Sequence, residues 1–68
     1  MAREERPIVF TITEITHNFG GLYTIRAEDG RIGKFVRKNI SYERLFAVMV
    51  DISSEYNNKG YAVLFEVD

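Results

Sequence analysis

A single stretch of this chain, residues 41–56, has the periodicity of an α-helix, and the rest of the fold must be arranged around it. Ser41 suits the N-cap, because its hydroxyl can accept a hydrogen bond from an unpaired amide of the first turn. Asn57, Asn58 and Gly60 end the stretch, since Asn and Gly tolerate the left-handed backbone that closes many helices. We therefore predict one helix, over residues 41–56.

The predicted helix has more apolar surface than one small core needs. At about 100° per residue, its apolar side chains fill an arc of roughly 200°, about twice the width of an ordinary buried stripe. Contiguous exposed apolar surface is uncommon on soluble monomers. We therefore expect one flank of the helix, at Phe46 and Val50 or at Val48 and Ile52, to contact a second chain.

Three other stretches have the alternation and the β-branched or aromatic content of strands, namely residues 8–14, 22–28 and 61–67. Asp29-Gly30 after the second stretch predicts a two-residue hairpin turn of type I′. That turn leads into a strand ending near residue 37 and pairs Tyr23 with Val36. Phe35 and Arg37 would then point outward with Leu22 and Arg26, while Val36 would lie beneath the helix.

The predicted order is β-β-β-α-β, an α+β fold with one helix on one face of a four-stranded sheet. A right-handed crossover places the last strand beside the first, in spatial order 4-1-2-3. The pattern leaves open the other edge of the sheet as its position. We expect residues 7–68 to form a single domain after a flexible tail at residues 1–6.

Composition narrows the class of protein. A chain of 68 residues buries only about 60% of its unfolded surface, so a partner would stabilise it. The sequence has no cysteine, which excludes disulfides and cysteine-based zinc sites. The charged start, MAREERP, has no apolar stretch behind it, and no apolar run is long enough to span a membrane. We expect a soluble cytoplasmic protein.

The net charge of −1 hides an uneven distribution. Residues 26–38 contain five cations and two acids, whereas residues 39–68 contain two cations and five acids. One hairpin is therefore basic and the half that contains the helix is acidic. This asymmetry favours contact between copies of the chain, or binding of an anionic partner on the basic side.

Residue patterns that indicate catalysis or metal binding are weak. His17 is the only histidine, and a general base or a metal site would need companions for it. The glycines at 20 and 21 lack the lysine and the helix that a phosphate-binding loop requires. We predict no enzyme activity, no cofactor and no metal site.

We instead predict a small protein-interaction module, which self-associates or binds a larger protein through the helix flank and the open sheet face. The alternative is binding of RNA or single-stranded DNA, with Phe35 as a stacking ring between cations. The predicted partner-binding residues are Leu22, Arg26, Phe35, Arg37, Lys38, Phe46, Val48 and Val50.

Overall fold

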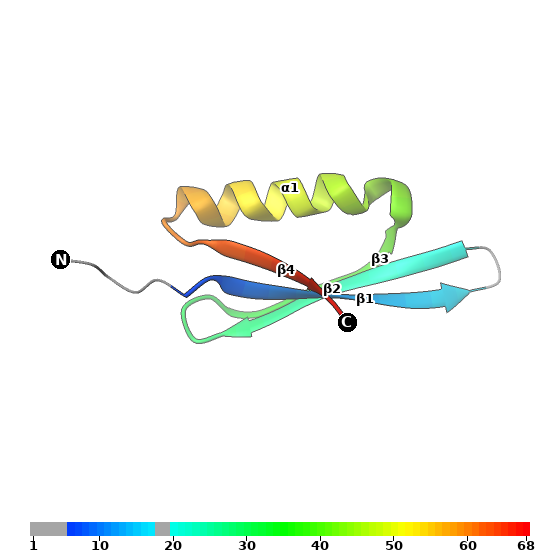
Figure 1. Ribbon diagram of the computed structural model, residues 1–68, viewed down its shortest axis with the longest axis horizontal. Helices are drawn as coiled ribbons and strands as arrows, with labels where there is room; N and C mark the ends of the chain where they lie inside the picture. The colour runs from blue at the N-terminus through cyan, green and yellow to red at the C-terminus, as the bar shows by residue number, and fades with distance from the viewer. Residues whose placement is uncertain (1–5, 18–19) are drawn as a thin grey trace.

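The computed structural model describes residues 6–17 and 20–68. Four strands form a single mixed sheet, and one helix packs against one of its faces (Figure 1). The elements follow the chain as β1 (Ile8–His17), β2 (Gly20–Asp29), β3 (Gly33–Ser41), α1 (Tyr42–Asn58) and β4 (Val63–Val67). The α+β class and the β-β-β-α-β order predicted from the sequence are confirmed.

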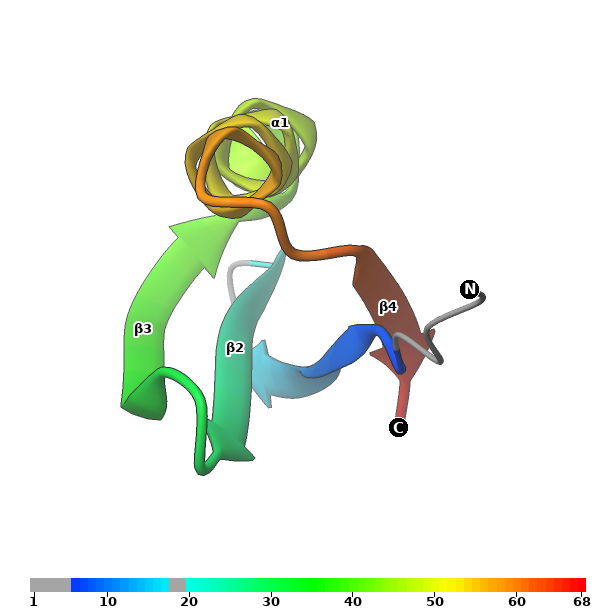
Figure 2. The same cartoon turned by 90° about the vertical axis from the view of Figure 1, so that its left-hand side faces the viewer.

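The strands lie in the order β3-β2-β1-β4, which is the predicted order 4-1-2-3 read from the other edge. β1 pairs antiparallel with β2 and parallel with β4, and β2 pairs antiparallel with β3. Figure 2 shows α1 on one side of the sheet, above β2 and β3. No other described element covers the opposite face, so the sheet has one covered face and one open face.

α1 begins and ends close to the predicted positions. Ser41 precedes it with an extended backbone, but its side chain makes no capping hydrogen bond. The helix continues to Asn58, two residues beyond the predicted end. The amide of Gly60 donates to the carbonyl of Asn57, and Gly60 has a φ of +95°, the left-handed conformation that glycine favours after a helix. The described residues include no helix with the length and apolar content to cross a membrane.

Phe10 lies at the centre of the core and is fully buried. Its ring centroid is 5.2 Å from that of Phe35 in β3, 5.5 Å from that of Tyr56 in α1 and 5.6 Å from that of Phe65 in β4. Phe10 thereby joins three elements to β1, at separations typical of favourable aromatic pairs.

The hairpin turn between β2 and β3 differs from the predicted type I′ turn. Asp29 pairs with Gly33, so three residues form the loop, and the Ile32 amide donates to the Asp29 carbonyl at 3.0 Å. Gly33, with a φ of +84°, has the left-handed conformation that the prediction gave to Asp29 and Gly30. The predicted turn is therefore wrong, and Glu28 pairs with Lys34 instead of with Arg31.

A charge-assisted contact closes this loop. The Arg31 guanidinium donates through Nε and Nη2 to the two carboxylate oxygens of Asp29, at 2.8 Å each, and the Arg31 amide donates to Oδ1. These hydrogen bonds hold the pKa of the Asp29 carboxyl well below its usual range. Arg31 Nη1 also donates to the Arg6 carbonyl at 2.7 Å. Arg6 is thus held against the loop, while residues 1–5 of the predicted tail lie outside the described residues.

Strand boundaries also differ from the prediction. β2 begins at Gly20, two residues earlier than predicted. β3 continues to Ser41, beyond the predicted end near residue 37, and a β-bulge between the Tyr23 and Ile25 pairs accommodates Asn39 at a φ of +60°. β1 continues to His17 through the pairing of Ile15 with Leu22. β4 begins at Val63, two residues later than predicted.

We predict that Phe10→Ala removes about 3–5 kcal/mol of unfolding free energy, because it deletes the ring on which three elements pack. A domain of this size has about 3–10 kcal/mol in total. The variant should therefore be largely unfolded or melt at a much lower temperature by circular dichroism. Val9→Ala, next to it on the open face, should lose about 1 kcal/mol or less. Equal losses for the two variants would contradict the central position of Phe10.

The hairpin gives a second prediction. Gly33→Ala should destabilise the fold by about 1 kcal/mol, since a Cβ is strained at a φ of +84°. Gly30→Ala is the matched control, because Gly30 lies in the same loop with equally open space around it and without a left-handed φ. Its stability should stay within about 0.5 kcal/mol of the wild type in urea unfolding. A larger loss of stability for Gly30→Ala than for Gly33→Ala would instead favour the predicted two-residue turn.

Candidate interaction surfaces

The observed register of β3 changes which of its side chains point outward. The pairing of Ala27 with Phe35 is displaced by three residues from the predicted register, and an odd displacement exchanges the two faces of a strand. Phe35 is consequently buried, at 8% exposure, and Val36 is exposed. The prediction that Phe35 points outward on the open face is wrong.

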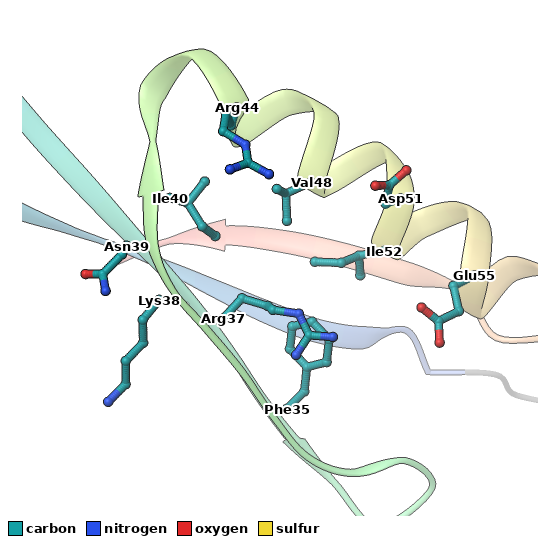
Figure 3. Close-up of a pocket in the computed structure, with 10 residues that line it drawn as sticks. All are labelled: Phe35, Arg37, Lys38, Asn39, Ile40, Arg44, Val48, Asp51, Ile52 and Glu55. Carbon is teal, nitrogen blue, oxygen red and sulfur yellow. The ribbon is translucent and has the colours of Figure 1, made fainter.

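The prediction that Arg37 points outward on the open face is also wrong. Its guanidinium carbon lies 4.6 Å from the centroid of the Phe35 ring, on the side of the strand that borders α1 (Figure 3). Its Nη1 donates to the backbone carbonyl of Val36 at 3.2 Å. Arg37 therefore covers the ring and one backbone acceptor of β3, whereas Lys38 points away from the helix.

The open sheet face retains Leu22 and Arg26 of the predicted residues. Around them lie Lys34 and Glu28, which pair across β2 and β3, and exposed Val36. A hollow of about 480 Å³ on this face has the following lining: Val9, Thr11, Arg26, Ala27, Glu28, Lys34, Phe35 and Val36. The face mixes aliphatic groups with charges of both signs, and no described side chain that points outward on it is aromatic.

α1 has two flanks of different chemistry. Tyr42, Phe46 and Val50 follow one another at intervals of four residues, and their exposed fractions are 60%, 59% and 65%. The Tyr42 and Phe46 rings are 6.0 Å apart, and Tyr23 of β2 extends the row at 6.2 Å from Tyr42. Burial raises the pKa of Tyr23, and the neighbouring Glu14 and Tyr42 raise it further, so its phenol stays neutral. We call the row of Tyr42, Phe46 and Val50 the uncharged flank.

Val67 is a further exposed apolar side chain, and it belongs to the sheet. It pairs with the core residue Ile12, and residues paired in a parallel ladder lie on the same face of a sheet. Val67 therefore lies on the face that bears the helix, yet it is 80% exposed. Figure 2 shows this end of β4 pointing away from α1. Val67 is therefore an exposed apolar side chain separate from the row on α1.

The other flank of α1 borders the edge strand β3 and is charged. Arg44, Asp51 and Glu55 lie along it, about 180° around the helix from the uncharged flank. Between this flank and β3 is a hollow of about 390 Å³, which we call the β3 groove (Figure 3). Its lining is Phe35, Arg37, Lys38, Asn39, Ile40, Arg44, Val48, Asp51, Ile52 and Glu55.

The structure separates the predicted partner-binding residues of the helix. Phe46 and Val50 are together on the uncharged flank, but Val48 is half-buried and lines the β3 groove. Three contributors were missing from the predicted set. Tyr42 could have been found from its spacing of four from Phe46, whereas the exposure of Val67 and the groove position of Arg44 depend on how α1 lies over the sheet.

His17 belongs to β1, but its side chain is outside what the structure describes, as are Asn18 and Phe19 of the glycine-containing connection. Within residues 6–17 and 20–68, no three carboxylate, histidine or cysteine side chains gather where they could hold a metal ion. The described part of the chain therefore offers surfaces, rather than a constellation of reactive groups, as candidate functional sites.

We predict that Arg37→Ala lowers the unfolding free energy by about 0.5–1 kcal/mol, because it removes the cation from the Phe35 ring. Lys38→Ala removes the neighbouring cation, which points away from the helix, and should change stability by less than about 0.5 kcal/mol. Urea unfolding of both variants measures the difference. Equal effects would show that the position of Arg37 over the ring contributes nothing.

No family model, curated protein or solved structure matches this chain.

Proposed function

We propose that this chain is a small protein-interaction module with no chemistry of its own, and that its partner on the uncharged flank is a second copy of the chain. The observation that supports this is the contrast between the two flanks of α1. Arg44, Asp51 and Glu55 are all exposed on one flank, as expected of a helix surface in water. The other flank exposes Phe46 and Val50 instead.

The uncharged flank is suited to contact with another protein surface. Glu43 lies beside the row of Tyr42, Phe46 and Val50, and Glu14 lies near Tyr23 at the end of the row. The other positions beside the row include the small residues Ala47 and Ser54. Small neighbours allow a second helix to approach closely, and large apolar side chains supply most of the free energy of such contacts.

A second copy fits this surface because the surface is self-complementary. In a twofold contact the two α1 helices would lie antiparallel, so that the uncharged flank of each covers that of the other. Arg44, Asp51 and Glu55 would stay in water on the far side of both helices. The antiparallel arrangement also opposes the two helix dipoles favourably.

The nucleic-acid alternative has lost the feature on which it depended. Binding of single strands needs rings on which bases stack, and Phe35 is buried beneath Arg37. On the open face Arg26 and Lys34 lie among the acids Glu28 and Glu66, so the local charge is close to balanced. The surfaces described here therefore favour a protein partner.

The double variant Phe46→Gln, Val50→Gln tests the proposal. We expect the wild type to sediment as a dimer at tens of micromolar, and the dimer to persist or strengthen in 1 M salt because the contact is apolar. The double variant should sediment as a monomer over the same range. Its circular dichroism and melting temperature at low concentration should match those of the wild type, since both side chains are already exposed.

Arg44→Gln, Glu55→Gln is the matched control. It places the same amide side chains at two exposed helix positions on the charged flank, and should leave the dimer intact. A wild-type monomer at several hundred micromolar would refute self-association. Equal weakening by both double variants would show that the contact is not at the uncharged flank.

A further inference from the structure

The β3 groove lies on the far side of α1 from the uncharged flank and is a separate feature. β3 is an edge strand, so one side of its backbone has no neighbouring strand among the described residues. The strand is regular from Gly33 to the bulge at Asn39, which gives about six residues of edge. α1 runs beside this edge in the opposite direction and forms the second wall (Figures 1 and 3).

The floor of the groove is apolar. Phe35, Ile40 and Ile52 are buried beneath it, and Val48 is half-buried at its side. The volume of about 390 Å³ is at the low end of the range of about 300–1,000 Å³ for ligand sites in proteins. The groove therefore has room for one aliphatic side chain of the size of leucine, with backbone beside it.

The charges that α1 contributes to the groove are separated along its length. Arg44 lies near Ile40 at the end where α1 begins, and Asp51 and Glu55 follow toward the other end (Figure 3). The Arg37 guanidinium also lies at that other end, on the Phe35 ring. Among the described residues no salt bridge joins Arg44 or Arg37 to Asp51 or Glu55. Glu55 approaches Lys59 at 3.7 Å, but both side chains are 57% exposed, so this pair is weak. These charges are therefore available to an occupant.

We propose that the β3 groove binds an extended peptide segment of another protein, which adds to the free edge of β3 as a fifth strand. Strand addition uses main-chain hydrogen bonds for affinity and alternate side chains for specificity. A segment antiparallel to β3 enters at the Arg44 end and leaves at the Glu55 end. Its side chains that face the groove should be an acid, an aliphatic residue and a base, in that order and two residues apart.

Arg37 controls access to the edge. Its guanidinium lies on the Phe35 ring and donates to the Val36 carbonyl, a backbone acceptor of this edge strand. Charged side chains of this kind protect edge strands from indiscriminate pairing. A peptide must displace Arg37 from the Phe35 ring and from the Val36 carbonyl. Binding is therefore restricted to segments whose acidic residue can form an ion pair with the displaced guanidinium. This is a second interface, independent of the proposed self-association.

The test uses the monomeric background Phe46→Gln, Val50→Gln, so that failure of dimerisation cannot affect it. An N-acetylated, C-amidated peptide Glu-Thr-Leu-Thr-Lys is titrated to millimolar concentration into ¹⁵N-labelled protein. We expect shifts confined to the amides of residues 33–38 and of the α1 residues that line the groove, namely Arg44, Val48, Asp51, Ile52 and Glu55. The reversed peptide Lys-Thr-Leu-Thr-Glu should bind about five-fold more weakly, because it places like charges together at both ends of the groove. A peptide with serine in place of leucine should not bind.

The charge-exchange variant Arg44→Glu, Glu55→Arg provides the decisive comparison, because both positions are exposed and the fold should tolerate it. It should prefer the reversed peptide. Absence of shifts along β3, equal affinity for both peptides, or a preference that the exchange does not reverse would each overturn the proposal. Shifts centred on positions 46 and 50 would place peptide binding elsewhere and overturn the proposal as well.

Discussion

The ring of Phe10 is the contact on which the rest of the structure depends. It belongs to a central strand, and it touches one ring each from β3, α1 and β4. β2 lies between β1 and β3. Next to Phe35 it has only the small side chain of Ala27, with which Phe35 pairs. A larger side chain at this position would fill the space in which the Phe10 and Phe35 rings meet, so the smallness of Ala27 and the size of the rings are complementary.

This core determines which surfaces remain for other molecules. Leu45, Ile52 and Tyr56 of α1 face the sheet, and they leave one flank of the helix over the edge of β3 and the other directed toward the β4 side. The charged side chains of the helix gather on the first flank and the exposed apolar ones on the second. The two surfaces therefore face away from each other, and occupation of one leaves the other free.

Features with a local cause could be predicted from the sequence. The alternation in residues 8–14 and the spacing of four in the helix each reflect one element facing one core, and together they led to the correct strand order. The hairpin could not be predicted in this way, because its geometry depends on the contact of Arg31 with Asp29 and on the left-handed Gly33. The pattern of apolar residues in β3 could not reveal the wrong register. Phe35 and Val36 are adjacent and both apolar, so either face of the strand could have been buried.

The candidate surfaces show the same limit. Phe46 and Val50 were identified because helical spacing alone brings them together. Arg44 and Phe35 reach the same groove only through the position of α1 over β3, which depends on the whole core.

The pairing of β4 with β1 has a consequence for how this protein acquires its structure. β1 is among the earliest described parts of the chain and β4 the last, and they form the ladder from Ile8–Val63 to Ile12–Val67. Until β4 arrives, β1 presents an unpaired edge and Phe10 lacks the ring of Phe65. During synthesis the sheet is therefore completed only after α1 and β4 have been made. Contacts between residues so distant in sequence form slowly. In that interval the growing chain exposes an unpaired edge of β1 that can pair with a neighbouring nascent chain.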